Sequence, residues 1–330
     1  MNFMKHLAAW ATSPPLGATA LPAWCYWDGV TCDSVPRSAS YGRVVELNLR
    51  MKGLTGTLPD SMGHFQSLVK LDMADNSLTG SIPNSVVNWS SSIKSIQLSS
   101  NRLSGTIPFV TGSMNSLTNL QLNDNRLRGS IPNSTVELTS LLHLSLASNS
   151  LSGSIPSSIG SMTALTTLSL SENHFQGPLP SELGYLTSLS GLDFSSNSFS
   201  GSLPSSIGNL KSLKTFSCHR NSLTGKIPST VGSMTSLKKM NMGHNELSGT
   251  IPTQFSNLLE LTDVVLEHNY LSMGSLESVP VSTFSFSTLR GHISVCSNCL
   301  TFKHHTAGPL PVHAACSPTN CRPSTESFSG

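Results

Sequence analysis

The stretch LLHLSLASNSLSGSIP, from Leu141 to Pro156, decides the fold of this chain. It follows the pattern L-x-x-L-x-L-x-x-N-x-L-x-G-x-I-P, which recurs around the asparagines at positions 76, 101, 125, 149, 173, 197, 221, 245 and 269. The first step between these asparagines is 25 residues and every later step is 24. With an earlier copy from Val44, in which Lys52 takes the place of asparagine, the chain contains ten copies. A fixed period of this length is the signature of stacked repeats, so the sequence predicts a solenoid.

Each letter of the pattern has a physical reason. The alternating L-x-L suits a strand with one buried face, and strands of stacked coils pair about 4.8 Å apart as a parallel sheet. The asparagine amide both donates and accepts, so it can satisfy backbone groups that a buried turn would otherwise leave unpaired. Glycine permits the tight turn that follows, and proline disfavours a helical return. We therefore expect a right-handed solenoid with a parallel sheet on its concave face, extended or 3-10 segments on its convex face, and little α-helix.

Composition narrows the class of protein. Of the 330 residues 11% are charged, and the formal net charge is +2. Nucleic-acid binding needs a basic face, so nucleic acid is not an expected partner. The sequence has no run of 18 apolar residues, and we expect no membrane span. The segment MNFMKHLAAWATSPP at the start holds a single lysine and a short apolar stretch, which does not make a clear signal peptide.

Catalytic motifs are missing from the sequence. It contains no G-x-S-x-G, no G-x-x-x-x-G-K-[ST] and no H-E-x-x-H. The segment GKIPST from Gly225 is only superficially like a phosphate loop, because Lys226 occupies a variable position of the repeat. We expect no catalytic residues, no cofactor and no enzymatic activity.

The repeats and the segment before them resemble a known family. In WCYWDGVTCDS the residues Cys25, Trp27, Gly29, Val30 and Cys32 match the C-x-W-x-G-V-x-C of the N-terminal cap of plant-type leucine-rich-repeat proteins. This resemblance covers roughly residues 5–276. It includes receptor-like-kinase ectodomains, receptor-like proteins, polygalacturonase-inhibitor-like proteins and protozoan leucine-rich surface antigens. The expected organisation is a cap at 1–42, ten repeats at 43–276 and an irregular tail at 277–330.

The cysteines bear on the compartment. The resemblance implies that Cys25 and Cys32 form a disulfide, which would place the chain outside the cell or at its surface; two free thiols in a reducing cell are the alternative. Cys218 stands at a core position of its repeat and is expected to be a small buried hydrophobe. The tail cysteines allow two disulfides, a zinc site or no ordered structure, and the spacing leaves these open: Cys296, Cys299, Cys316 and Cys321.

Two tripeptides match the N-glycosylation signal, at Asn88 and Asn133. Asn133 follows Pro132 and is expected on the convex return, and Asn88 lies in the repeat with the extra residue. Glycans there would leave the concave face free. Chance occurrence in a chain rich in Asn and Ser is the alternative.

Specificity should reside in the variable positions of the concave strands. In the middle repeats these positions are small and polar, whereas charged and imidazole side chains gather in the last three repeats: Lys214, His219, Arg220, Lys238, Lys239, Asn241, His244, Asp263, Glu267 and His268. We expect this patch to bind an acidic ligand such as a peptide carboxylate, an anionic glycan or a sulfated group. The alternative is an ordinary solvated charged face. A smaller mixed set lies in the first repeats: Glu46, Arg50, Lys70, Asp72 and Asp75.

The function expected from these observations is recognition. The chain should be a non-enzymatic extracellular or cell-surface module that binds a protein, peptide or glycan on its concave sheet. The alternatives are a structural or adhesive surface antigen, an ectodomain fragment of a receptor-like kinase, and an inhibitor of a secreted glycosidase.

Overall fold

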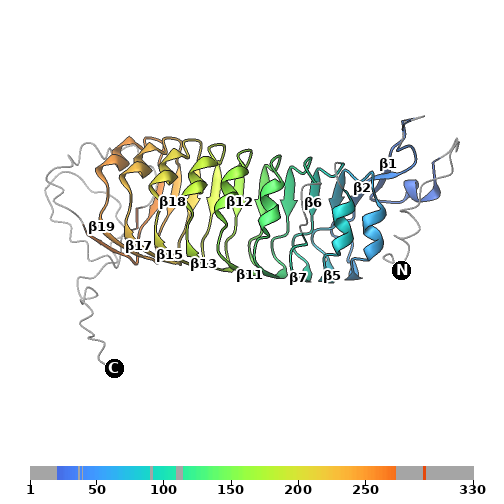
Figure 1. The fold of residues 1–330 in the computed structure, drawn as a ribbon, viewed down its shortest axis with the longest axis horizontal. Helices are drawn as coiled ribbons and strands as arrows, with labels where there is room; N and C mark the ends of the chain where they lie inside the picture. The colour runs from blue at the N-terminus through green and yellow to red at the C-terminus, as the bar shows by residue number, and fades with distance from the viewer. Residues whose placement is uncertain are drawn as a thin grey trace, which may run out of the picture.

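The chain forms a single stack of coils, with β1 at one end and β19 near the other (Figure 1). The computed structural model describes residues 21–35, 38, 40–89, 92–108, 114–272 and 293–294. Each coil contributes one strand to a first sheet, one strand to a second sheet and, in most coils, a 3-10 turn between them. The predicted solenoid is confirmed. In the described part of the chain there is no α-helix, and no helix there is long and apolar enough to cross a membrane.

The first sheet, called the concave sheet below, carries the L-x-L residues. Its strands, in order, are β1 (Val30–Cys32), β2 (Val44–Asn48), β4 (Lys70–Asp72), β6 (Ser95–Gln97), β8 (Asn119–Gln121), β10 (His143–Ser145), β12 (Thr167–Ser169), β14 (Gly191–Asp193), β16 (Thr215–Ser217), β18 (Lys239–Asn241), β20 (Asp263–Val265) and β22 (Ile293–Ser294). All pairs are parallel except β1 with β2.

A second sheet, called the side sheet below, is formed by the residues after each asparagine. Its strands are β3 (Thr55–Thr57), β5 (Ser77–Ser81), β7 (Arg102–Gly105), β9 (Arg126–Gly129), β11 (Ser150–Gly153), β13 (His174–Pro178), β15 (Ser198–Ser202), β17 (Ser222–Lys226), β19 (Glu246–Thr250) and β21 (Tyr270–Ser272). The 3-10 helices are η1 (Ala23–Tyr26), η2 (Asp60–His64), η3 (Asn84–Trp89), η4 (Asn133–Glu137), η5 (Ser157–Ser161), η6 (Ser181–Tyr185), η7 (Ser205–Asn209), η8 (Ser229–Ser233) and η9 (Thr253–Asn257).

The two sheets differ in register. In the concave sheet, partners are one repeat apart, as in Thr167↔Gly191, a separation of 191 − 167 = 24 residues. In the side sheet, Gln176 pairs with Ser198, a separation of 198 − 176 = 22 residues. Each side strand is therefore displaced by two residues, about 6.6 Å, along its neighbour. As a result, equivalent residues of successive repeats stack directly on the concave sheet but run obliquely across the side sheet.

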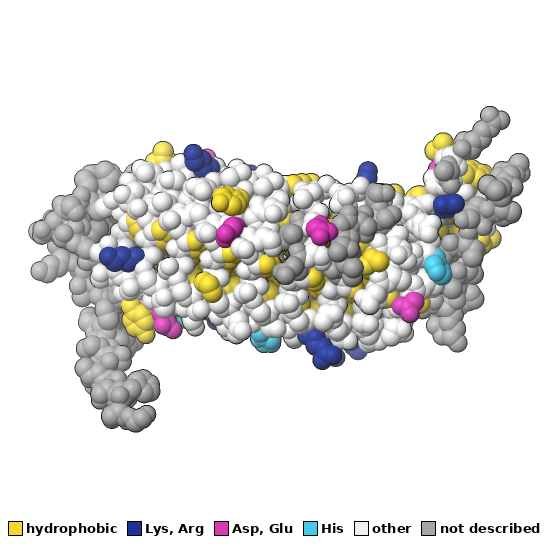
Figure 2. All heavy atoms as spheres, in the orientation of Figure 1, with side chains coloured by type: hydrophobic (Ala, Val, Ile, Leu, Met, Phe, Trp, Pro, Cys, Tyr) yellow, Lys and Arg dark blue, Asp and Glu magenta, His cyan; other side chains and the backbone are white. Residues whose placement is uncertain are grey.

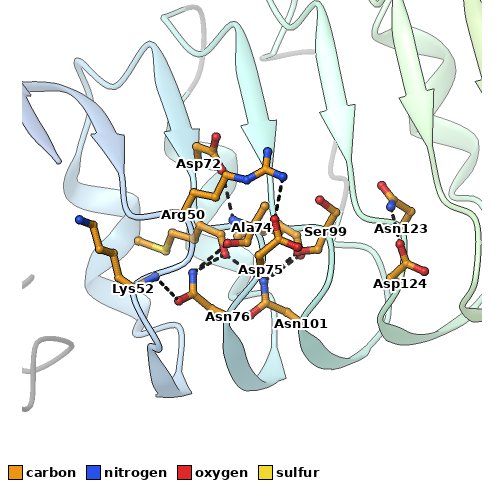
Figure 3. Close-up of polar contacts among 12 residues, drawn as sticks. Arg50, Lys52, Asp72, Ala74, Asp75, Asn76, Ser99, Asn101, Asn123 and Asp124 are labelled. Carbon is orange, nitrogen blue, oxygen red and sulfur yellow. Dashed lines mark hydrogen bonds and ion pairs between the residues drawn. The ribbon is translucent and has the colours of Figure 1, made fainter.

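The repeated asparagines form a hydrogen-bonded ladder between the sheets (Figure 3). The Nδ2 of Asn76 donates to the carbonyl oxygens of Leu49, Met73 and Ala74 at 2.9, 2.9 and 3.0 Å. Its Oδ1 accepts from the backbone N–H of Leu54 at 2.9 Å. Asn149, Asn173, Asn245 and Asn269 make the equivalent contacts and are buried. The amide thus satisfies the backbone of the turn, as the sequence predicted.

The residue immediately before this asparagine, or before Lys52 in the first repeat, has a left-handed backbone in all ten repeats. Its φ lies between 52° and 56°, and it is never glycine: Met51, Asp75, Ser100, Asp124, Ser148, Glu172, Ser196, Arg220, His244 and His268. A non-glycine residue in this conformation costs about 1–2 kcal/mol, which the hydrogen bonds of the turn must offset. The column lies along one edge of the concave sheet, so its side chains are displayed in a row.

The N-terminal end of the stack is covered by its own cap. Strand β1 pairs antiparallel with β2, and Cys25 and Cys32 form the disulfide that the resemblance implied, with a Cα–Cα distance of 5.4 Å. Lys52, which replaces the repeat asparagine, forms an ion pair with Asp28 of the cap at 2.6 Å. The missing asparagine of the first repeat is thus replaced by a side chain that contacts the cap.

Candidate ligand-binding face

The patch predicted from the sequence lies on strands β16, β18 and β20 of the concave sheet. Their register is direct: Thr215, Lys239 and Asp263 are partners, as are Ser217, Asn241 and Val265. Buried Phe216, Met240 and Val264 alternate with these residues and point into the core. The side chains of the patch therefore stand on the outer face of one rigid sheet.

One group of the patch lies where these strands begin. Lys214, Lys238 and Lys239 are exposed, and Asp263 is half-buried. The Nζ of Lys238 lies 3.6 Å from Glu260, and the Nζ of Lys239 lies 3.9 Å from Asp263. Both ion pairs are long, so the lysines stay available to a stronger partner. Within the described part of the chain Lys214 forms no ion pair.

A second group lies where the same strands end. The rings of His244 and His268 stack with centroids 4.1 Å apart, and His244 Nε2 lies 3.9 Å from Glu267 Oε1. His219 Nδ1 lies 2.9 Å from the Ser217 hydroxyl. Partial burial, followed by the neighbouring His268, lowers the pKa of His244, while Glu267 acts in the opposite direction. Arg220, exposed in the same left-handed column, forms no ion pair with any described residue.

Small side chains separate these two groups. Ser217, Asn241 and Val265 occupy the middle of the strands, and the Asn241 amide oxygen accepts from the N–H of Gly243 at 3.1 Å. The patch thus consists of two rows of charged or imidazole side chains, with a row of uncharged side chains between them. This geometry suits an extended ligand that lies across the strands and places anionic groups on either side.

The charged set of the first repeats differs, because its members neutralise one another. Arg50 pairs with Asp75 at 2.7 Å, and Lys70 pairs with Glu46 at 2.8 Å (Figure 3 shows the first pair). Asp72 is buried and accepts from the N–H of Ala74. Short ion pairs leave little charge for a ligand, so the C-terminal patch is the better candidate.

Comparisons with known proteins agree with the fold. Two family models match, one described as "Leucine rich repeat" over residues 115–175 and one as "Leucine Rich Repeat" over 67–89, 188–210, 212–234 and 236–258. The LRR ectodomain of the Arabidopsis thaliana membrane receptor kinase GASSHO1/SCHENGEN3, solved with CASPARIAN STRIP INTEGRITY FACTOR 2, has a TM-score of 0.74 and 30% identity. The chain is a leucine-rich-repeat protein, and its repeats are similar to those of plant receptor-kinase ectodomains.

This leucine-rich-repeat chain spans only part of the length of the receptor-kinase ectodomains GASSHO1/SCHENGEN3 and HAESA. The alignment with GASSHO1/SCHENGEN3 covers 91% of this chain and 38% of that one. The Arabidopsis HAESA ectodomain, solved with an N-terminally extended IDA peptide hormone, gives a TM-score of 0.66 at 29% identity over 91% of this chain and 53% of that one. A plant ice-binding protein gives 0.63 at 26% identity over 89% of each chain. No curated protein sequence matches the chain.

Other residues singled out in the sequence occupy ordinary places in the leucine-rich-repeat scaffold. Cys218 is fully buried, and burial raises the pKa of its thiol well above the usual range. Asn88 is exposed on η3, and Asn133 begins η4. Cys296, Cys299, Cys316 and Cys321 lie outside the described residues. Among the described residues there is no cluster of three or more His, Cys, Asp or Glu side chains that could hold a metal ion.

Sequence reasoning missed Glu260, which pairs with Lys238 from the turn before β20. It stands outside the L-x-x-L-x-L-x-x-N window, so the pattern gave no reason to place it beside the concave strands. Its position, one residue before the Leu261 that opens the tenth repeat, is the signal that could have found it.

Proposed function

We propose that this leucine-rich-repeat chain is a non-enzymatic extracellular or cell-surface recognition module that binds an acidic peptide across strands β16, β18 and β20. The observation that carries the proposal is that the lysine and arginine side chains there have no ion-pair partner or only a distant one. Lys214 and Arg220 form no ion pair with described residues, and the lysine ion pairs are 3.6 and 3.9 Å long. A peptide carboxylate can form shorter charge-assisted hydrogen bonds with the same groups.

The solved relatives support a peptide as the kind of ligand. The HAESA ectodomain is described in complex with a peptide hormone, and again with that hormone and the co-receptor SERK1. The chain spans about half or less of the GASSHO1/SCHENGEN3 and HAESA ectodomains, so only the repeat surface is compared. The ice-binding relative shows that fold likeness alone does not fix a ligand, so the unpaired charges of the patch carry the proposal.

The test is a binding experiment with a synthetic acidic peptide library. Peptides with several Asp or Glu residues, and neutral peptides in which these are replaced by Asn or Gln, are titrated against the wild-type protein by biolayer interferometry. We expect selective binding of acidic peptides. The double variant Lys238→Glu, Lys239→Glu should weaken the best peptide at least tenfold, or about 1.4 kcal/mol.

A matched control carries the same change in net charge. Lys94 occupies the same column of the concave sheet near its other end, and Lys211 lies in a turn; both are exposed. The double variant Lys94→Glu, Lys211→Glu should bind the peptide within about twofold of wild type. Equal losses in both variants, or no preference for acidic peptides, would refute the proposed site.

A further inference from the structure

Three arginines gather on the side sheet, on the outer faces of β7 and β9. Arg102 and Arg126 each begin a strand, and Arg128 lies two residues further along β9. In β7 and β9, Ser104 is the partner of Arg126, and Gly105 is the partner of Leu127. By this register the Cα atoms of Arg102 and Arg128 each lie about 7–8 Å from that of Arg126, using standard strand geometry. The three side chains therefore stand on one face of the sheet, with the Cα atoms of Arg102 and Arg128 about 14 Å apart.

These guanidinium groups are not neutralised. All three side chains are exposed, and none forms an ion pair with another described residue. None of the three arginines is directly opposite another, but like charges this close repel, so the cluster costs stability in the isolated chain. Figure 2 shows Lys or Arg side chains projecting together from the lower edge of the molecule, while most of the visible face is uncharged.

The surroundings of the cluster are hydroxyl groups rather than apolar or aromatic side chains. In the ladder, Arg102 is beside Thr79, Arg126 is beside Ser104, and Arg128 is beside Ser150. In the described structure the hydroxyls of Ser104 and Ser150 make no side-chain hydrogen bond. A flat face of arginines and free hydroxyls offers bidentate donors for anions and small polar groups for sugar hydroxyls. It lacks the aromatic platforms on which single-stranded nucleic acid stacks.

We propose that Arg102, Arg126 and Arg128 form a second binding site, distinct from the concave patch, for an anionic polysaccharide that lies along the side sheet. Arg102 and Arg126 follow the oblique direction set by the two-residue stagger of this sheet, and Arg128 lies two residues further along β9. A linear polymer with recurring sulfate or carboxylate groups can contact all three, whereas a single small anion cannot. The site is on another face from the peptide patch, so both ligands can be held at once.

The experiment measures the affinity of the full chain for heparin, which carries sulfates, and for polygalacturonate, which carries carboxylates. The variant is Arg102→Ser, Arg126→Ser, Arg128→Ser, because serine occupies the equivalent positions in other repeats, as at Ser150 and Ser152. We expect at least a tenfold loss of affinity for one or both polymers. The thermal midpoint should stay equal or rise, because repulsion between the arginines is removed.

The control triple variant, Lys52→Ser, Lys94→Ser, Lys211→Ser, removes the same charge from three exposed lysines that belong to neither site. It should bind both polymers within about twofold of wild type. A loss limited to heparin identifies sulfate as the recognised group, and a loss limited to polygalacturonate identifies the carboxylate. If the two triple variants lose affinity equally, or if the arginine variant binds as wild type does, the side-sheet site is overturned. Acidic peptide binding is measured separately, so its failure leaves this result intact.

Discussion

The surroundings of His244 disfavour its protonated form, so protonation of this side chain lowers the stability of the folded protein. Partial burial, the stacked ring of His268 and the nearby cations lower its pKa below the ordinary 6.5. The unfolded chain therefore takes up this proton at a higher pH than the folded chain. The stability that the neutral imidazole contributes is complete above pH 6.5 and is lost as the pH falls through the lowered pKa.

The corresponding prediction concerns the loss of thermal stability between pH 7.5 and pH 5, measured by circular dichroism at equal ionic strength. His244→Asn should reduce that loss, because it removes the titrating ring and asparagine tolerates the left-handed backbone. The control His174→Asn changes an exposed histidine on the side sheet and should retain the wild-type loss. Equal pH dependence in the two variants would contradict the assignment to His244.

Individual residues also show what the sequence could and could not predict. The role of the asparagines follows from their chemistry, because an uncharged amide carries two donor hydrogens and an acceptor oxygen on separate atoms and can serve both kinds of backbone group in one turn. The positions of the concave side chains follow from strand alternation. The stacking of His244 on His268 does not, because it depends on side-chain rotamers. The pairing of Lys238 with Glu260 likewise depends on a turn outside the motif.

Among the elements, the 3-10 turns stack closely because they contain glycine. A Cβ built on Gly208 of η7 would lie 2.2 Å from the carbonyl oxygen of Thr230 in η8, and one built on Gly184 or Gly232 would lie 2.5 or 2.3 Å from a carbonyl oxygen of the next coil. Backbone at this distance cannot give way without shifting the next coil. Gly208→Ala should therefore lower the free energy of unfolding by about 1–3 kcal/mol.

Urea denaturation followed by tryptophan fluorescence and circular dichroism measures this difference. The control is Asn209→Ala, one residue along the same 3-10 helix, where the side chain is exposed. We expect the control to stay within about 0.5 kcal/mol of wild type. If Gly208→Ala is as stable as Asn209→Ala, the close stacking of η7 on η8 does not limit this position.

For the side sheet, the sequence predicts that extended segments form but does not predict how they pair. The G-x-I-P ending predicts an extended return, and the structure has strands there. The period of 24 also gives the register of the concave sheet directly. In the side sheet, paired residues are 22 positions apart rather than 24. The repeat pattern is the same for either pairing, so the sequence alone does not predict which register forms. Without that register, the grouping of Arg102, Arg126 and Arg128 cannot be read from the sequence.

The molecule as a whole is a one-dimensional stack, in which each coil contacts only its neighbours. Strand β10 pairs with β8 and β12 alone, in the same register on both sides. Deleting residues 141–164 removes one full period of 24 and brings β12 against β8 with equivalent residues opposite. The stability of a solenoid is close to a sum of repeat and interface contributions, so the shortened chain should fold and lose one coil.

The deletion of residues 141–164 is compared with a deletion of residues 141–152, which removes half a period. This shorter deletion places side-sheet and 3-10 residues where concave strand residues are needed, so buried leucines face solvent and the asparagine ladder is broken. We expect the full-period deletion to keep a cooperative thermal transition and the per-residue circular dichroism of the parent, and the half-period deletion to lose both. The full-period variant should also keep the acidic-peptide affinity, since strands β16, β18 and β20 are untouched. Failure of both deletions to fold would mean that the stack is stabilised by interactions beyond nearest neighbours.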